Sequence, residues 1–179
     1  LAFAKAGAQV LACDVNLAGC EETAALAGGL AAKVDVTDTA SCRALADLAQ
    51  ARMGGVDVLV NNAAMYGGLE RRNFEDLDED IWDKVMAVNV RSVFLGAKFA
   101  IPAMRERGGG SIINTASVAG LGGGGGPQAY SAAKAGIRNL TQNLGREWAQ
   151  FDVRVNAIRP GFFPTEWNRK NFITPEREA

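Results

Sequence analysis

Short apolar runs alternate with longer amphipathic segments along the chain. The apolar runs have the length and composition of buried parallel strands and cover residues 9–13, 31–36, 56–60, 111–115 and 153–158. Helical periodicity lies between them, in residues 17–26, 39–53, 79–107 and 128–150. Strands that alternate with helices predict an α/β protein, in which a mostly parallel sheet carries helices on both faces.

Residues 79–107 are predicted to form one long helix. Its core-facing positions recur at steps of four and three: Ile81, Val85, Val88, Ser92, Leu95 and Phe99. Asn89 lies one step from this stripe, and its amide needs a hydrogen-bond partner if it is buried. Pro102 is expected to bend or locally disrupt the helix.

Composition narrows the function classes. The chain has 179 residues, enough for one domain over 1–179, with 19 Lys+Arg against 20 Asp+Glu. This balance argues against a nucleic-acid partner, and no apolar run approaches the roughly 20 residues of a membrane span. The chain has no histidine, which excludes a Ser-His-Asp triad and a His-ligated zinc. Proton chemistry must therefore use Tyr, Lys, Cys, Asp or Glu.

The three cysteines do not suggest a disulfide framework. Cys13, Cys20 and Cys42 are an odd number and lack CxxC spacing. A reducing, cytoplasmic location is therefore expected.

Polar residues follow several of the predicted strands. Asp14, Asp35, Asn61, residues 115–117 and Pro160 all stand near strand ends. Ligands of open parallel sheets bind beyond the carboxyl ends of the strands. These residues therefore indicate a binding site at that edge.

Tyr130 and Lys134 are the strongest candidates for chemistry. Four residues apart, they share one face of the predicted helix 128–150. An ammonium beside a phenol favours the phenolate, so we expect Lys134 to lower the pKa of Tyr130 from its usual value near 10. A solvated surface pair would have the same spacing. Ser117 lies upstream, and the glycine-rich loop 118–127 can bring it close to Tyr130.

Taken together, these motifs resemble the short-chain dehydrogenase/reductase family. They occur in the family's order along the chain: Asp14, Asp35-Val36, Asn61-Asn62-Ala63-Ala64, Asn89, Ser117, Tyr130 with Lys134, and Pro160-Gly161. Ala64 stands where the family most often has Gly. The resemblance implies a Rossmann-like, doubly wound parallel sheet.

The resemblance also implies catalytic roles without a metal. Tyr130 would exchange a proton with the substrate oxygen, and Ser117 would hydrogen-bond that oxygen. Lys134 would lower the pKa of Tyr130 and bind the nicotinamide ribose. Asn89 would hold a water molecule that relays protons from Lys134 to solvent.

The implied cofactor is NAD rather than NADP. A carboxylate at Asp14 can accept ribose hydroxyl bonds and would repel a 2′-phosphate, although Asp14 could instead be a turn or helix-capping residue. Asp35 and Val36 would contact the adenine. The cofactor groove and the nicotinamide region would be completed by Asn62, Ala63, Pro160 and Gly161.

The domain is expected to be incomplete. The family's glycine-rich turn should lie about 20 residues before Asp14, which is upstream of Leu1. The strand before it would lie between 9–13 and 56–60, and a last strand is also expected to be missing. We therefore predict that this chain alone binds NAD poorly or not at all.

The sequence specifies the substrate and the oligomeric state less well than the fold. An alcohol–ketone oxidoreductase acting on a sugar, a sugar acid or another small polar substrate is favoured. Residues 162–170 would form part of the lid over the substrate pocket, although a solvated charged loop would have the same composition. Alternatives are a 3-oxoacyl thioester reductase, a non-catalytic NAD-binding relative, a sugar-nucleotide epimerase or dehydratase, and a structural domain. The family implies a homotetramer formed through 79–107 and 128–150. Residues at that interface, or equally in the core, would be Phe94, Phe99, Leu140 and Trp148.

Overall fold

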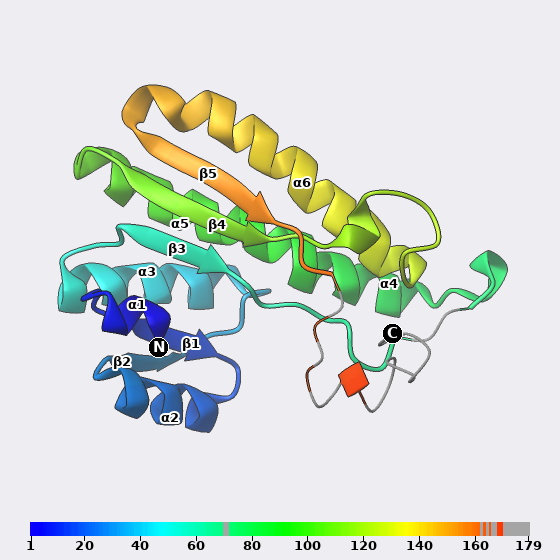
Figure 1. Cartoon of the computed structure of the whole chain (residues 1–179), viewed down its shortest axis with the longest axis horizontal. Helices are drawn as coiled ribbons and strands as arrows, with labels where there is room; N and C mark the ends of the chain where they lie inside the picture. Colours follow the sequence, from blue (N-terminus) through cyan, green and yellow to red (C-terminus); the bar gives the residue numbers. More distant parts are fainter. Residues whose placement is uncertain (70–71, 162, 164, 166–167, 170–179) are drawn as a thin grey trace.

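The strands form two parallel sheets in a computed structural model, which describes residues 1–69, 72–161, 163, 165 and 168–169. The smaller sheet pairs β1 (Leu11–Asp14) with β2 (Leu30–Lys33). The larger sheet has the order β3 (Val58–Asn61), β4 (Gly110–Thr115) and β5 (Val153–Ile158). The arrowheads of β1, β3, β4 and β5 point the same way, so their carboxyl ends lie at one edge (Figure 1).

Six α-helices accompany these strands in the described residues. They are α1 (Ala2–Lys5), α2 (Leu17–Ala27), α3 (Thr39–Met53), α4 (Glu79–Met86), α5 (Ser92–Glu106) and α6 (Gln128–Trp148). Side chains of Asn16, Asp38 and Asp78 cap the starts of α2, α3 and α4. Gly54 ends α3 in a left-handed conformation, which glycine adopts without steric cost.

The predicted long helix 79–107 is interrupted, and not where the sequence suggested. A π-helical turn, Ala87–Arg91, separates α4 from α5. Pro102 lies inside α5, which continues to Glu106, so the disruption expected at proline is not found there. The extra residue in the turn accommodates Asn89, whose side chain is fully buried. The other predicted helices and strands are confirmed, with ends shifted by a few residues.

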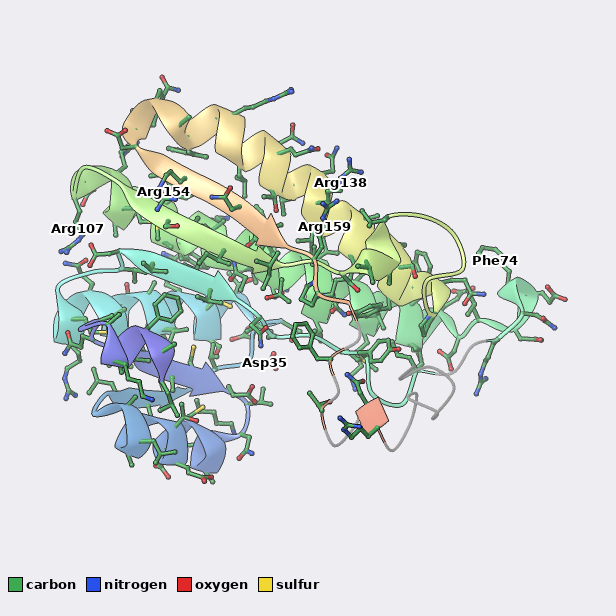
Figure 2. The ribbon with its side chains drawn as sticks, in the orientation of Figure 1. Asp35, Phe74, Arg107, Arg138, Arg154 and Arg159 are labelled. Atoms are coloured by element: carbon green, nitrogen blue, oxygen red, sulfur yellow. The ribbon has the colours of Figure 1, made fainter. Side chains whose placement is uncertain are left out.

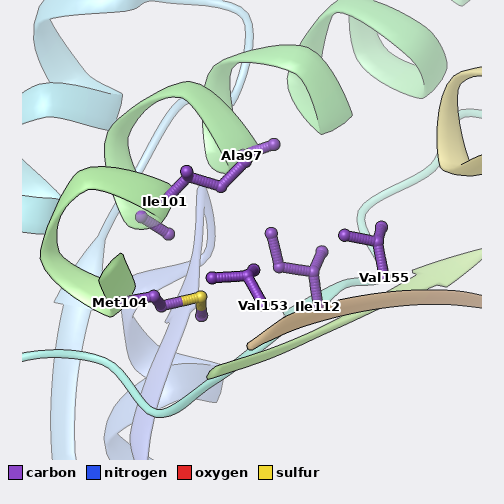
Figure 3. Close-up of a cluster of buried hydrophobic side chains, with 7 residues drawn as sticks. Ala97, Ile101, Met104, Ile112, Val153 and Val155 are labelled. Atoms are coloured by element: carbon purple, nitrogen blue, oxygen red, sulfur yellow. The ribbon is translucent and has the colours of Figure 1, made fainter. Parts of the chain in front are cut away.

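The main core lies between α5 and the larger sheet (Figure 3). Ile101 and Met104 on α5 pack against Ile112 on β4 and Val153 on β5, all at most 4% exposed. Two smaller clusters join α6 to α4 and to the strand ends. These contacts fix α6, which carries Tyr130 and Lys134, against β4 and β5.

The opposite face of the larger sheet is open in the described part of the chain. Val58 and Val60 on β3 and Ile158 on β5 are each about half exposed. No described strand joins β1 to β3, so the two sheets remain separate. The expected discontinuity between residues 9–13 and 56–60 is therefore present.

One helical run, Glu79–Glu106, is long and apolar enough by composition to cross a membrane. This is weak support for a span, because 44% of its most apolar window is buried and the core helix of a globular protein passes the same test. Val85, Leu95 and Met104 from this run all belong to the buried interior.

Candidate active site

The loop after β4 brings Ser117 to the first turns of α6. A short 3-10 helix, Val118–Gly120, follows Ser117, whose hydroxyl accepts a hydrogen bond from the Ala119 amide at 3.2 Å. A Cβ on Gly120 would lie 2.7 Å from backbone atoms of Lys134 and Ala135, so only glycine permits this close approach. The loop therefore packs directly on the segment of α6 that carries the catalytic candidates.

Tyr130 is close enough to the Ser117 hydroxyl for that group to influence its pKa, and its ring packs against a second tyrosine. The Tyr66 and Tyr130 ring centroids are 4.7 Å apart. Burial raises the pKa of Tyr130, while the Ser117 hydroxyl lowers it by a smaller amount. The expected lowering of this pKa is therefore wrong for the protein without cofactor, since burial outweighs the groups that stabilise the phenolate.

Lys134 is an almost fully buried lysine, with 2% of its surface exposed. Its Nζ donates a hydrogen bond to the carbonyl of Thr115 at 2.6 Å and lies 5.5 Å from the centroid of the Tyr130 ring. Burial lowers its pKa to about 8. The ammonium is thus directed to the end of β4, and this position explains why it does not lower the Tyr130 pKa here.

The side-chain amide of Asn89 has its nitrogen hydrogen-bonded and its oxygen without a partner among the described residues. Its Nδ2 donates to the carbonyls of Val85 at 3.0 Å and Met65 at 3.1 Å. Its Oδ1 is buried, and no hydrogen-bond partner is found for it in the described residues. A buried amide oxygen of this kind needs a donor, so the site suits a water molecule.

A network that the sequence analysis missed links the strand ends beneath these residues. Asn61 donates to Asn114 at 2.9 Å, and Asn114 donates to Thr141 on α6 at 3.0 Å. Asn114 is fully buried. The sequence did contain a signal for this network: Asn114 lies within the apolar run 111–115, and a buried amide in a strand needs hydrogen-bond partners from other side chains.

The two carboxylates predicted to hold the cofactor lie at the ends of β1 and β2. Asp14 is exposed and accepts a hydrogen bond from the Asn16 amide at 3.0 Å, so it also serves as the turn residue that the sequence allowed. Asp35 is exposed as well and lies at the edge to which the arrowheads point (Figure 2). Hydrogen bonds from Thr37 lower the pKa of Asp35, so it is ionised at neutral pH.

The remaining cofactor candidates are also at strand ends. Asn62 accepts a hydrogen bond from Thr115 at 3.1 Å, and Ala63 beside it is exposed. Pro160 accepts one from the Val118 amide at 3.2 Å, and exposed Gly161 follows it. Val36 is partly buried next to Asp35. The substrate-facing segment expected at 162–170 lies mostly outside the described residues.

A cavity of about 180 Å³ lies close to this region but is a separate feature. Met65, Trp82 and Gln128 are among its lining residues. None of the four catalytic candidates lines it. The candidate active site is therefore the strand-end cluster around Ser117, Tyr130 and Lys134.

Comparisons with known proteins agree with this geometry. A family model described as short chain dehydrogenase matches residues 1–176. The chain is 40% identical to the probable galactose dehydrogenase of Rhizobium meliloti (strain 1021), with 99% of this chain and 71% of that protein covered. It is 36% identical to the 3-oxoacyl-(acyl-carrier-protein) reductase of Thermotoga maritima, with 95% and 70% covered.

A solved structure has the same fold. It is a crystal structure assigned to the short-chain dehydrogenases/reductases, from Burkholderia xenovorans, with a TM-score of 0.84 and 36% identity. The alignment covers 94% of this chain and 66% of that one. This chain thus spans about two thirds of the length of the relatives it matches.

These findings define the class of protein. The chain belongs to the short-chain dehydrogenases, oxidoreductases that use NAD(P) and act on small molecules. The predicted Rossmann-like α/β fold is confirmed.

Proposed function

We propose that the protein interconverts an alcohol and a ketone by hydride transfer, with Tyr130 as the acid/base. The observation that carries the proposal is the cluster at the end of β4, where the Ser117 hydroxyl stabilises the Tyr130 phenolate and buried Lys134 lies 5.5 Å from the centroid of the Tyr130 ring. A hydroxyl, a phenol and an ammonium at one strand end can bind a carbonyl oxygen and exchange a proton with it.

The chain's own residues fit a dinucleotide. Carboxylates at Asp14 and Asp35 stand at neighbouring strand ends, where they can accept hydrogen bonds from ribose and adenine. Val36, Asn62, Ala63, Pro160 and Gly161 would complete the groove, and Lys134 and Tyr130 would bind near the nicotinamide. NAD is preferred in this proposal because Asp14 would repel a 2′-phosphate.

In the reductive direction, Tyr130 donates its proton to the substrate oxygen as charge develops there. Ser117 donates a hydrogen bond to the same oxygen. The hydride comes from a bound nicotinamide cofactor or, in the oxidative direction, is delivered to it. Because burial raises the pKa of Tyr130, the phenol is present at neutral pH and is ready to donate.

The oxidative direction requires the phenolate, and Lys134 is the group that can stabilise it. Its ammonium is partly deprotonated near pH 8, since its pKa is lowered to about 8. Asn89, with its unpartnered Oδ1, would hold the water that returns protons to Lys134. Buried Lys134 is otherwise screened from solvent, so such a relay supports proton exchange.

A sugar or sugar acid is the proposed substrate class. The relative from Rhizobium meliloti, described as a probable galactose dehydrogenase, supports this choice. The alternative is a 3-oxoacyl thioester, supported by the relative from Thermotoga maritima. A non-catalytic NAD-binding protein is the third possibility, and the filled catalytic positions argue against it.

We also propose a cytoplasmic homotetramer for the complete protein. Phe94 on α5 supports an interface there, because it is 47% exposed and Lys98 lies over its ring, 5.5 Å from the centroid. Leu140 and Trp148, which the sequence assigned equally to interface or core, pack against core clusters. Phe99 is partly buried beneath Arg43.

The test is a panel of sugars, sugar acids and 3-oxoacyl thioesters on the complete protein, monitored by NADH absorbance. Tyr130→Phe should lower turnover by roughly 10²–10⁴-fold, the usual contribution of a general acid or base. Tyr66→Phe, which removes the chain's other tyrosine hydroxyl, should cause a much smaller loss. Equal losses would show that Tyr130 is not the acid/base, and no turnover on the panel would favour a non-catalytic relative.

A further inference from the structure

The segment after β2 is held in shape by bonds within itself. The amide and hydroxyl of Thr37 donate to one carboxylate oxygen of Asp35, at 2.8 and 2.7 Å. The Asp35 amide donates to the Ser41 hydroxyl at 3.0 Å. These contacts join residues two to six positions apart, so they define the local shape of the turn but not its position on the protein.

Arg91 connects this segment to the π-helical turn between α4 and α5. Its guanidinium donates one hydrogen bond to the Thr37 carbonyl and another to the Thr39 hydroxyl, the latter at 3.0 Å. The bonded residues are 54 and 52 positions apart in the sequence. A planar guanidinium fixes two acceptors at once, which a lysine ammonium does less well.

The π-helical turn Ala87–Arg91 therefore contacts both the loop after β3 and the segment after β2. Asn89 points inward and donates to the Met65 carbonyl in the loop after β3. Arg91, two residues later, reaches the segment after β2. The turn thus holds the Asp35 segment in a fixed position relative to the layer that carries the acid/base candidates.

We propose that Arg91 is a positioning residue for cofactor binding: by fixing Thr37 and Thr39 it holds Asp35 where the adenosine half of the dinucleotide binds. The hydrogen bonds of Arg91 go to Thr37 and Thr39, and neither is an acid/base candidate. The inference rests on the proposed role of Asp35. It follows that loss of Arg91 weakens binding of the adenosine half and leaves binding of the nicotinamide half unchanged.

The test uses the complete protein and two ligands that share the nicotinamide-side ribose and its phosphate. ADP-ribose carries the adenosine half and no nicotinamide, and reduced nicotinamide mononucleotide carries the nicotinamide half and no adenosine. In calorimetry, Arg91→Ala should weaken ADP-ribose binding about tenfold, as expected for the loss of a hydrogen-bonded charged group, and should not change the binding of the mononucleotide. Amide hydrogen exchange at Thr37 should become faster.

Arg107 provides a matched control. It also donates to a carbonyl, that of Gly54 at 2.6 Å, and to a side-chain oxygen, that of Asp57 at 3.0 Å. It lies at the opposite end of the sheet from Asp35 (Figure 2). Arg107→Ala removes the same charge and similar bonds, so it should lower stability without changing ADP-ribose affinity.

Asp35→Asn separates the inference from the proposal on which it rests. If Asp35→Asn weakens ADP-ribose binding and Arg91→Ala does not, the inference about Arg91 is overturned and the cofactor assignment stands. If neither variant changes it, the assignment of Asp35 to the cofactor is wrong. Equal weakening of both ligands by Arg91→Ala would also overturn the inference. Should Arg91→Ala fail to fold, Thr39→Val removes one of its acceptors and should weaken ADP-ribose alone, by a smaller factor.

Discussion

The two sheets of this protein differ in how they hold their polar residues. In the larger sheet, β4 has buried positions along its length, and the side chains at its carboxyl end are joined by hydrogen bonds to β3 and α6. In the smaller sheet, no residue of β1 or β2 is fully buried. Asp14, the last residue of β1, and Asp35, in the turn after β2, are both exposed.

This difference corresponds to two kinds of chemistry. Proton transfer benefits from groups whose pKa values are shifted by burial, and Tyr130 and Lys134 are of this kind. Hydrogen bonding to a nucleoside needs carboxylates at an accessible surface. Asp35, which is proposed to contact the adenine, meets that need because hydrogen bonds from Thr37, and not burial, determine the direction of its pKa shift.

The largest effect is expected on the free energy of unfolding, when an apolar side chain is truncated in each of the two sheets. Ile112→Ala on β4 removes a fully buried side chain and should lower the free energy of unfolding by about 2–5 kcal/mol. Leu11→Ala on β1 should cost less, since Leu11 is only partly buried. Urea denaturation of both variants measures this, and equal losses would contradict the contrast between the sheets.

A smaller effect concerns pH. The pKa of Lys134 is lowered from 10.5 to about 8, so between these values the unfolded chain binds a proton that the folded protein has lost. The stability that depends on Lys134 therefore rises with pH, by roughly 2 kcal/mol between pH 8 and pH 10. Thermal unfolding of the wild type and of Lys134→Met at pH 8 and 10 tests this. The variant should lack the rise, and a parallel pH response of the two proteins would refute it.

A substitution at the carboxyl end of the smaller sheet should alter the choice between NADH and NADPH more than the stability of the protein. Asp14→Ala removes the charge that would repel a 2′-phosphate, so the preference of the complete protein for NADH over NADPH should fall about tenfold. The melting temperature should change little, because Asp14 is exposed and its carboxylate accepts from a nearby amide in the turn. The measurement is the ratio of kcat/KM for the two cofactors, and an unchanged ratio would remove Asp14 from the cofactor site.

The smallest effect is spectroscopic. The chain has two tyrosines, so phenolate absorbance can be assigned with a single variant. The component lost in Tyr130→Phe should titrate above the usual value of about 10 in the cofactor-free protein, because burial raises the pKa of Tyr130. Titration below that value would indicate that Lys134 stabilises the phenolate even without cofactor.

The sequence predicted local structure well where one signal was dominant. The helix at Thr39–Met53 and the strand at Val153–Ile158 have the predicted ends, because periodicity, a capping residue or a glycine marks them. The π-helical turn Ala87–Arg91 was missed. Asn89 in this turn is buried and bonds to Met65, a contact between segments that periodicity within the helix does not report.

The sequence alone determined the alternation of strands and helices, the order of the family motifs and the absence of histidine chemistry. These features are local or compositional, so they can be read without knowing which segments meet. Only the tertiary structure decided which polar groups are buried. It raised the pKa of Tyr130, directed Lys134 to Thr115 and joined Arg91 to Thr37, since each effect depends on neighbours that chain folding brings together.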